Sequence, residues 1–264
     1  MITVGLILVV LLILVILNIK SLMYNRFRGR FEYVQQSNDL PVDMVYCISM
    51  PQRIEYVTKQ MKEIGTSYKL FHAISPKDLT TLDYLLFSTA LIPGTHLYKK
   101  FTKLPVILSF FMCYYDAWKN GYDSICILED DIILKESVQN IRTLIHEFNA
   151  TAGVDILYMG YCWLDCRNPE QFKQISPSLR LVPNNKQILC NHAMVLNKDL
   201  IDRYMRRYNL FLNNINNDNN LDKFLRDNTI PRAVPTHGYI DQNYEKLGSN
   251  NENDNIRIKT CIIR

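Results

Sequence analysis

The hydrophobic pattern of the chain begins with residues 1–19, a run of mostly apolar side chains that contains no charge. Its length is close to the roughly 20 residues that an α-helix needs to cross a bilayer. The run has neither the basic start nor the small-residue cleavage site of a signal peptide, and a soluble helix is rarely apolar on every face. We therefore predict a membrane anchor at 1–20, a linker at 21–41 and one globular domain at 42–264.

The basic residues around this run predict its orientation. Lys20, Arg26, Arg28 and Arg30 follow it, whereas only the terminal amine precedes it. Positive residues next to a membrane span tend to remain cytosolic, so we expect a single-pass protein with a cytosolic C-terminal domain, and a lumenal domain is the alternative. The glycosylation acceptor sequence at 149–151 is attributed to chance in this Asn-rich chain.

The rest of the chain alternates between strand-like and helix-like patterns. Apolar runs of strand length occur at 43–49, 68–74, 124–128, 154–160 and 190–196, and apolar residues at helical spacing mark 54–64, 104–118, 138–148 and 198–208. Gly65 is a stop signal for the first of these helices, and Asn197 is a cap for the last. Strand, helix and strand in succession indicate a parallel crossover. We therefore predict an α/β fold with a central mixed, mostly parallel sheet.

The strand predicted at 124–128 leads into three consecutive carboxylates, Glu129, Asp130 and Asp131. Acids at the carboxyl edge of an α/β sheet lie where ligands bind. Successive strand side chains point to opposite faces, so Glu129 and Asp131 should face one way and Asp130 the other. That spacing suits Mg²⁺ or Mn²⁺ together with a phosphate-bearing ligand. The alternative is a solvated acidic turn, although three adjacent like charges repel one another without a cation or basic partner.

Two further groups of side chains have alternative interpretations. Arg53 stands just beyond the strand at 43–49, where its guanidinium could hold a diphosphate or a base, or could be a solvated residue in the first turn of the next helix. The aromatic residues of the helix at 104–118 are more typical of core packing than of a ligand site. They are Phe110, Phe111, Tyr114 and Trp118.

Composition excludes several classes of function. The formal net charge is +4, and no stripe of basic and aromatic residues indicates nucleic-acid binding. The chain contains neither a phosphate-binding P-loop motif nor a dinucleotide fingerprint, which weakens the case for another kind of phosphate-processing enzyme. Among the seven cysteines, Cys47 and Cys126 are expected as buried thiols, whereas Cys162 and Cys166 could form a disulfide or bind metal.

Five segments in this order resemble glycosyltransferase family 25, which includes lipopolysaccharide-type transferases and collagen galactosyltransferases. They are residues 45–53, 108–109, 125–132, 191–193 and 221–222, and the resemblance covers roughly 43–250. Gln242 and Ser249 match a looser closing motif of the family. The chain has Phe110 where the family usually has a histidine, and Ser49-Met50 where the family has Asn-Leu.

The resemblance implies a GT-A-type fold, a nucleotide-sugar donor (a UDP-sugar is expected), Mn²⁺ or Mg²⁺ at the acidic motif, and inversion at the anomeric carbon. Such a transfer needs a Lewis acid for the leaving diphosphate and a carboxylate for the proton of the acceptor hydroxyl. Asp131, with Glu129 or Asp130, suits the first task as a metal ligand. Asp222 is the candidate base, and Asp218 and Asp241 are its rivals. The alternative for Asp222 is an ordinary acid at a helix N-terminus.

His192 completes the candidate site. It could touch the donor or the metal ion, or it could be a hydrogen-bonded core residue; with Arg53 and Asp130 it forms the predicted donor-binding set. We predict a membrane-anchored, metal-dependent inverting glycosyltransferase (a hexosyltransferase) that acts on a glycan, lipid-linked or protein acceptor. The alternative is a catalytically silent carbohydrate-binding or scaffold relative with the same fold.

Overall fold

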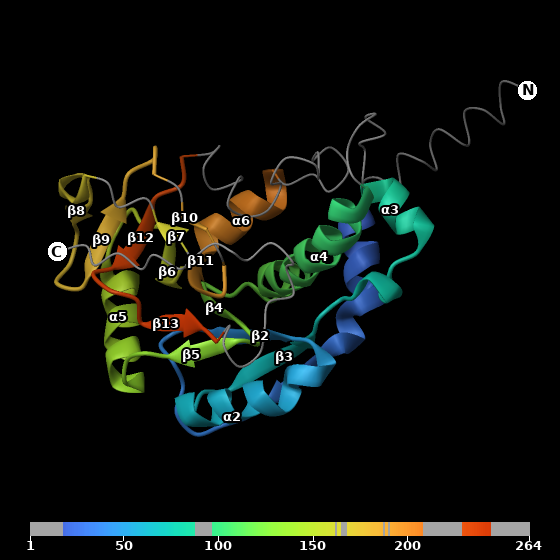
Figure 1. Cartoon of the computed structure of the whole chain (residues 1–264), viewed down its shortest axis with the longest axis horizontal. Helices are drawn as coiled ribbons and strands as arrows, with labels where there is room; N and C mark the ends of the chain where they lie inside the picture. Colours follow the sequence, from blue (N-terminus) through green and yellow to red (C-terminus); the bar gives the residue numbers. More distant parts are fainter. Residues whose placement is uncertain are drawn as a thin grey trace, which may run out of the picture.

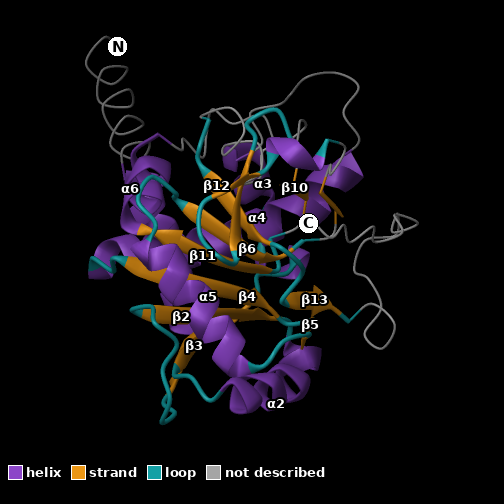
Figure 2. Ribbon diagram, turned by 90° about the vertical axis from the view of Figure 1, so that its left-hand side faces the viewer, coloured by secondary structure: helices purple, strands orange, loops and turns teal. Residues whose placement is uncertain are grey.

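The computed structural model describes residues 18–87, 97–161, 163–164, 168–186, 188–189, 191–207 and 229–243. They form a mixed α/β fold in which helices cover both faces of a nine-stranded sheet (Figure 1, Figure 2). Residues 18–27 are helical and are called the N-terminal helix below. The other helices are α2 (Ile54–Ile64), α3 (Thr81–Phe87), α4 (Leu97–Asn120), α5 (Val138–Ala150) and α6 (Lys198–Arg207), with 3₁₀ turns η1 (Arg28–Arg30), η2 (Pro51–Arg53), η3 (Pro76–Asp78) and η4 (Pro169–Gln171).

The large sheet has the strand order β1-β3-β2-β4-β11-β6-β12-β9-β8. Its strands are β1 (Phe31–Val34), β2 (Met44–Ser49), β3 (Tyr68–His72), β4 (Ser124–Glu129), β6 (Ile156–Gly160), β8 (Lys173–Gln174), β9 (Leu179–Val182), β11 (Ala193–Asn197) and β12 (Arg232–Pro235). Two short pairs lie outside it: β5 (Ile132–Leu134) with β13 (Ile240–Gln242), and β7 (Trp163–Leu164) with β10 (Ile188–Leu189).

The direction of the strands is mixed. The pairs β2–β3, β2–β4 and β6–β12 are parallel, which confirms the crossover predicted from the first strand, helix and strand. The strand β11 lies antiparallel between β4 and β6, and the outer strands β1, β9 and β8 also pair antiparallel. The sheet is therefore mixed, as predicted, and its parallel part is concentrated around β2.

Alternate side chains of the central strands pack into two separate hydrophobic cores. On β4, Ile125 and Ile127 belong to the core shared with α4, α6 and the N-terminal helix, whereas Cys126 and Leu128 belong to the core shared with α2 and α5. This alternation is the two-residue period of a strand that is buried on both faces. Cys47 and Cys126 are buried free thiols, as predicted.

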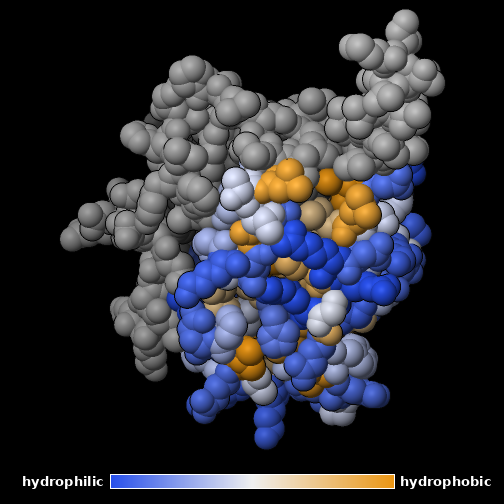
Figure 3. Space-filling view, turned by 90° about the vertical axis from the view of Figure 1, so that its right-hand side faces the viewer, coloured by the Kyte–Doolittle hydropathy of each residue, from blue (hydrophilic) through white to orange (hydrophobic). Residues whose placement is uncertain are grey.

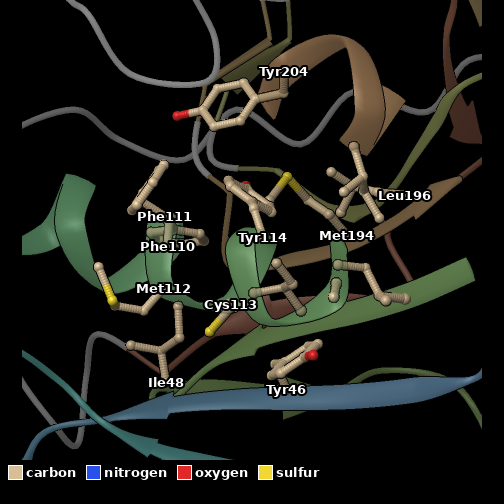
Figure 4. Packing of buried hydrophobic residues seen from close by; sticks show 14 of the residues in the cluster. Tyr46, Ile48, Phe110, Phe111, Met112, Cys113, Tyr114, Met194, Leu196 and Tyr204 are labelled. Atoms are coloured by element: carbon tan, nitrogen blue, oxygen red, sulfur yellow. The ribbon is translucent and has the colours of Figure 1, made fainter. Parts of the chain in front are cut away.

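Helix α4 supplies the aromatic part of the first core. Phe110, Phe111 and Tyr114 are buried between the sheet and α6, and Tyr114 meets Tyr204 edge-on at 5.1 Å between ring centroids (Figure 4). These three residues confirm the prediction of core packing. Trp118, one turn further on, is 43% exposed, so its assignment to the core was wrong. It lies near the exposed end of the helix and packs beside Tyr115.

The linker predicted at 21–41 is wrong for most of its length. Met23, Tyr24 and Phe27 are buried in the first core, because their spacing of three and four residues gives the N-terminal helix one apolar face. The following strand, β1, pairs antiparallel with β3 and forms an edge of the large sheet. The globular unit therefore includes residues well before 42.

Two predicted helix ends are confirmed by their geometry. Helix α2 ends at Gly65, whose φ of 76° is a left-handed conformation that glycine adopts without steric cost. The side chain of Asn197 accepts a hydrogen bond from the backbone N–H of Leu200 at 3.0 Å and so caps α6.

No helix within the described residues is both long and apolar enough to cross a bilayer. The predicted anchor lies almost wholly in residues 1–17, which are outside the described residues.

Candidate functional site

The three acids lie where β4 leaves the sheet. Glu129 is the last residue of β4, Asp130 and Asp131 form the turn, and β5 begins at Ile132. Because β2, β3 and β4 are parallel, their carboxyl ends share this edge of the sheet. This is the edge at which ligands bind in open α/β sheets.

Asp130 points toward the start of α2. One carboxylate oxygen accepts a hydrogen bond from the backbone N–H of Met50 at 2.7 Å, and the other pairs with the Arg53 guanidinium at 2.9 Å. Both charged side chains are less than one tenth exposed. Arg53 is therefore buried, and the alternative of a solvated first-turn residue is wrong. Arg53 ends the 3₁₀ turn η2, which follows β2, the parallel neighbour of β4.

Glu129 and Asp131 converge on the side chain of Gln242. The amide nitrogen of Gln242 donates to Oε2 of Glu129 at 3.2 Å and to Oδ1 of Asp131 at 3.3 Å. The predicted alternation along the motif is thus confirmed, with Glu129 and Asp131 sharing one partner and Asp130 held by Met50. Arg53 also approaches Asp131, at 3.4 Å, so the guanidinium lies between the two aspartates.

The electrostatics of this cluster favour a cation. Burial, followed by the nearby charges of Asp131 and Asp130, raises the pKa of Glu129 to about 8. Burial and the Asp130 charge likewise raise the pKa of Asp131. The Arg53 guanidinium is the one basic side chain with a described ion pair to these three acids. Additional positive charge near Glu129 and Asp131 would favour their ionised forms and lower the pKa of both.

The strand β13 brings Gln242 to the acids. It pairs antiparallel with β5, with Gln242 opposite Ile132. Asn243 fixes the end of this pair: its backbone N–H donates to the carbonyl of Asp131 at 2.6 Å, and its side-chain amide donates to the hydroxyl of Tyr56 at 2.9 Å. That hydroxyl in turn donates to the carbonyl of Ile132 at 2.9 Å. The backbone on both sides of the site is therefore tied to α2.

The predicted donor-binding residue His192 lies beside the acids but is fully buried. Its carbonyl accepts a hydrogen bond from the backbone N–H of Glu129 at 2.8 Å, and its Nε2 lies 3.5 Å from the carbonyl of Ile240. Burial lowers the pKa of His192 to about 4, so the imidazole is neutral near pH 7. A Cβ at Gly160 would overlap both the imidazole and Ile240, so a glycine is needed there. These contacts favour the core interpretation of His192.

The described acids fit a divalent cation as a pair. Glu129 and Asp131 offer oxygen atoms, the ligand type that Mg²⁺ and Mn²⁺ prefer. In the part of the chain that the structure describes, no three His, Cys, Asp or Glu side chains are grouped to hold a metal ion. A cation at this pair would therefore complete its coordination with water or with oxygens of a bound phosphate, and Asp130 would support the site through Arg53.

Sequence reasoning assigned Gln242 only to a family motif and did not place it at the acids. The available signal was its match to that closing motif, whereas its contact with Glu129 spans 113 positions along the chain. The candidate base Asp222 and its rival Asp218 lie outside the described residues, as do Cys162 and Cys166. The other rival, Asp241, lies on β13 with its carboxylate 3.8 Å from Lys135.

A mixed α/β sheet with paired carboxylates at the carboxyl end of a central strand is typical of proteins that bind phosphate-bearing ligands through a cation. Comparison with known proteins defines the class more closely. The family model of glycosyltransferase family 25, described as a lipopolysaccharide biosynthesis protein, matches residues 43–240. The chain belongs to glycosyltransferase family 25.

One curated relative is a glycosyltransferase 25 family member from Drosophila melanogaster. It is 24% identical over 163 residues, which cover 55% of this chain and 27% of the relative. The aligned part thus spans about a quarter of that relative's length.

Proposed function

We propose that this chain is a divalent-cation-dependent, inverting glycosyltransferase with a GT-A-type domain. It transfers a hexose from a nucleotide-sugar, with a UDP-sugar as the expected donor, to a hydroxyl of a glycan, lipid-linked or protein acceptor. The observation that carries the proposal is the convergence of Glu129 and Asp131 at the carboxyl end of β4, in a chain of this family.

In this proposal the two carboxylates bind the cation, and Arg53 holds Asp130 behind them. The bound Mn²⁺ or Mg²⁺ supplies Lewis-acid stabilisation of the negative charge on the leaving diphosphate. Arg53 is already engaged with Asp130 and Asp131, so we assign it to shaping the site rather than to binding the donor directly.

The acceptor half of the reaction needs a base. The acceptor oxygen forms a bond to the anomeric carbon while the bond from that carbon to the diphosphate oxygen breaks, and the diphosphate leaves with the electron pair. The hydroxyl proton passes to a carboxylate on the acceptor side. We assign this role to Asp222, because Glu129 and Asp131 are occupied on the donor side. This assignment rests on the match to the family motif.

The deciding experiment measures sugar transfer and donor hydrolysis with a panel of nucleotide-sugars and Mn²⁺, for the full chain and for two variants. Asp131→Asn should abolish cation-dependent turnover and leave the fold intact. Asp222→Asn should keep donor binding and lower transfer about 10²–10⁴-fold, the usual contribution of acid–base catalysis. A matched control is Asp123→Asn, because Asp123 is an exposed acid at the opposite end of β4 whose partner is Lys198.

Unchanged activity of Asp131→Asn would contradict the cation site. A wild-type chain that binds carbohydrate but neither binds nor hydrolyses any nucleotide-sugar would instead support the catalytically silent relative. Loss of donor binding in Asp222→Asn would make Asp222 a binding or structural residue.

A further inference from the structure

The side-chain amide of Gln242 contacts both Glu129 and Asp131. A primary amide has two N–H groups, so one nitrogen can donate to both carboxylates at once. The distances of 3.2 and 3.3 Å are at the long end for N–H···O bonds, so neither contact is a tight one. The amide therefore marks the position between the carboxylates without binding either of them strongly.

The backbone at Gln242 is held by strand pairing and by the residue that follows it. Gln242 pairs with Ile132 where β13 runs antiparallel to β5. The next residue, Asn243, is tied to the carbonyl of Asp131 and to Tyr56. The antiparallel pairing of β5 with β13 therefore brings the side chain of Gln242 to the acids.

The negative charge of the cluster explains why the neutral amide of Gln242, rather than an acid, contacts Glu129 and Asp131. Arg53 lies against Asp130 and Asp131 but makes no described contact with Glu129. Without a further partner, repulsion would drive the carboxylates of Glu129 and Asp131 apart. A neutral amide can orient both of them and leaves their negative charge available to a cation.

We propose that Gln242 is a positioning residue that holds Glu129 and Asp131 in a convergent arrangement for a divalent cation. The inference rests on the proposed function, because it takes the cation site as given. Side chains that hydrogen-bond to metal ligands orient those ligands, and their loss typically weakens metal affinity about 10–100-fold.

The test is a titration of the full chain with Mn²⁺ alone, in which electron paramagnetic resonance measures free Mn²⁺. Gln242→Leu removes the amide at similar size and should raise the Kd for Mn²⁺ about 10–100-fold. Gln242→Glu keeps the length and adds a third carboxylate, so it should lower the Kd. Gln174→Leu is the matched control, because Gln174 lies exposed on the distant edge strand β8, and its Kd should equal that of wild type.

The response of Gln242→Glu separates positioning from a purely structural role. If Gln242 only stabilised the pairing of β5 with β13, both variants would lower the melting temperature and neither would tighten Mn²⁺ binding, and that result would overturn the inference. A Kd for Gln242→Leu equal to that of wild type, with the fold intact by circular dichroism, would overturn it as well. A wild-type chain that binds no Mn²⁺ would also overturn the inference.

The outcome is independent of the proposed transfer reaction. If wild type binds Mn²⁺, the variants shift the Kd as expected and no nucleotide-sugar is consumed, the positioning role stands and the proposed function fails. If transfer requires Mn²⁺ but the Gln242 variants bind it as wild type does, the proposed function stands and the positioning role fails.

Discussion

At the scale of single residues, the ion pair between Arg53 and Asp130 decides how the acidic motif is built. Both side chains are less than one tenth exposed, and Asp130 also accepts a hydrogen bond from Met50. Desolvation makes an isolated buried charge very costly, so each partner requires the other. This arrangement explains how three consecutive acids coexist, since the middle one is neutralised from the side of α2.

Arg53→Met is therefore expected to destabilise the protein by about 3–5 kcal/mol, the usual cost of removing one partner of a buried pair. Chemical denaturation measures this free energy of unfolding. Arg206→Met is the matched control, because Arg206 forms an exposed pair with Asp202 at 3.7 Å. Exposed pairs contribute about 0–1 kcal/mol, so the control should stay close to wild type. Equal, small effects of the two substitutions would show that Arg53 is not a structural partner of Asp130.

At the scale of secondary-structure elements, the N-terminal helix and β1 are parts of the domain. Asp116 of α4 links the helix to the domain: one carboxylate oxygen accepts from the hydroxyl of Tyr24, and the other accepts from Tyr46 and from Lys69. A buried aspartate with three donors connects the N-terminal helix to α4, β2 and β3. Arg26 adds an ion pair with Asp83 at the start of α3.

Substitutions on opposite faces of this helix test its packing. Phe27→Ala should cost about 3–5 kcal/mol, because Phe27 is 4% exposed within the core. Leu22→Ala should change the free energy of unfolding by no more than about 0.5 kcal/mol, because Leu22 is half exposed on the same helix. Thermal or denaturant unfolding of both variants measures the difference. A true linker would tolerate the two substitutions equally.

At the scale of the whole molecule, the packed N-terminal helix bears on how the domain meets a membrane. The chain before residue 18 is uncharged, and residues 18–27 continue it as a helix that packs on the domain. In the described surface that Figure 3 shows, the lower part is mostly hydrophilic and apolar residues gather in the upper part. If residues 1–17 form the proposed anchor, little free chain separates the bilayer from the domain.

We expect the domain to be cytosolic, because the basic residues all follow the uncharged run. In sealed inside-out vesicles, in which the cytosolic face is outward, added protease should digest residues 32–264 without detergent. Glu129→Gln, folded but altered only at the site, should behave identically and serves as a control for activity-dependent effects. Protection of the domain in such vesicles, or a glycan attached at Asn149, would place it on the lumenal side.

The sequence alone was sufficient for features that depend on neighbouring residues. Periodicity located α2, α4 and α5, and the apolar run before Glu129 located β4, because side-chain spacing reports local conformation and burial. The alternation of Glu129, Asp130 and Asp131 followed from the same two-residue period. Asn197 and Gly65 marked helix ends through their own backbone and side-chain chemistry.

Tertiary structure decided which distant groups meet. An apolar run such as β11 has the same pattern whether it is parallel or antiparallel, so its direction between β4 and β6 could not be predicted from the run. Arg53 could be assigned to Asp130, and Gln242 to Glu129 and Asp131, only once strand order was known. The physical reason is that period and propensity act over a few residues, whereas the pairing of charges and amides depends on which chain segments pack together.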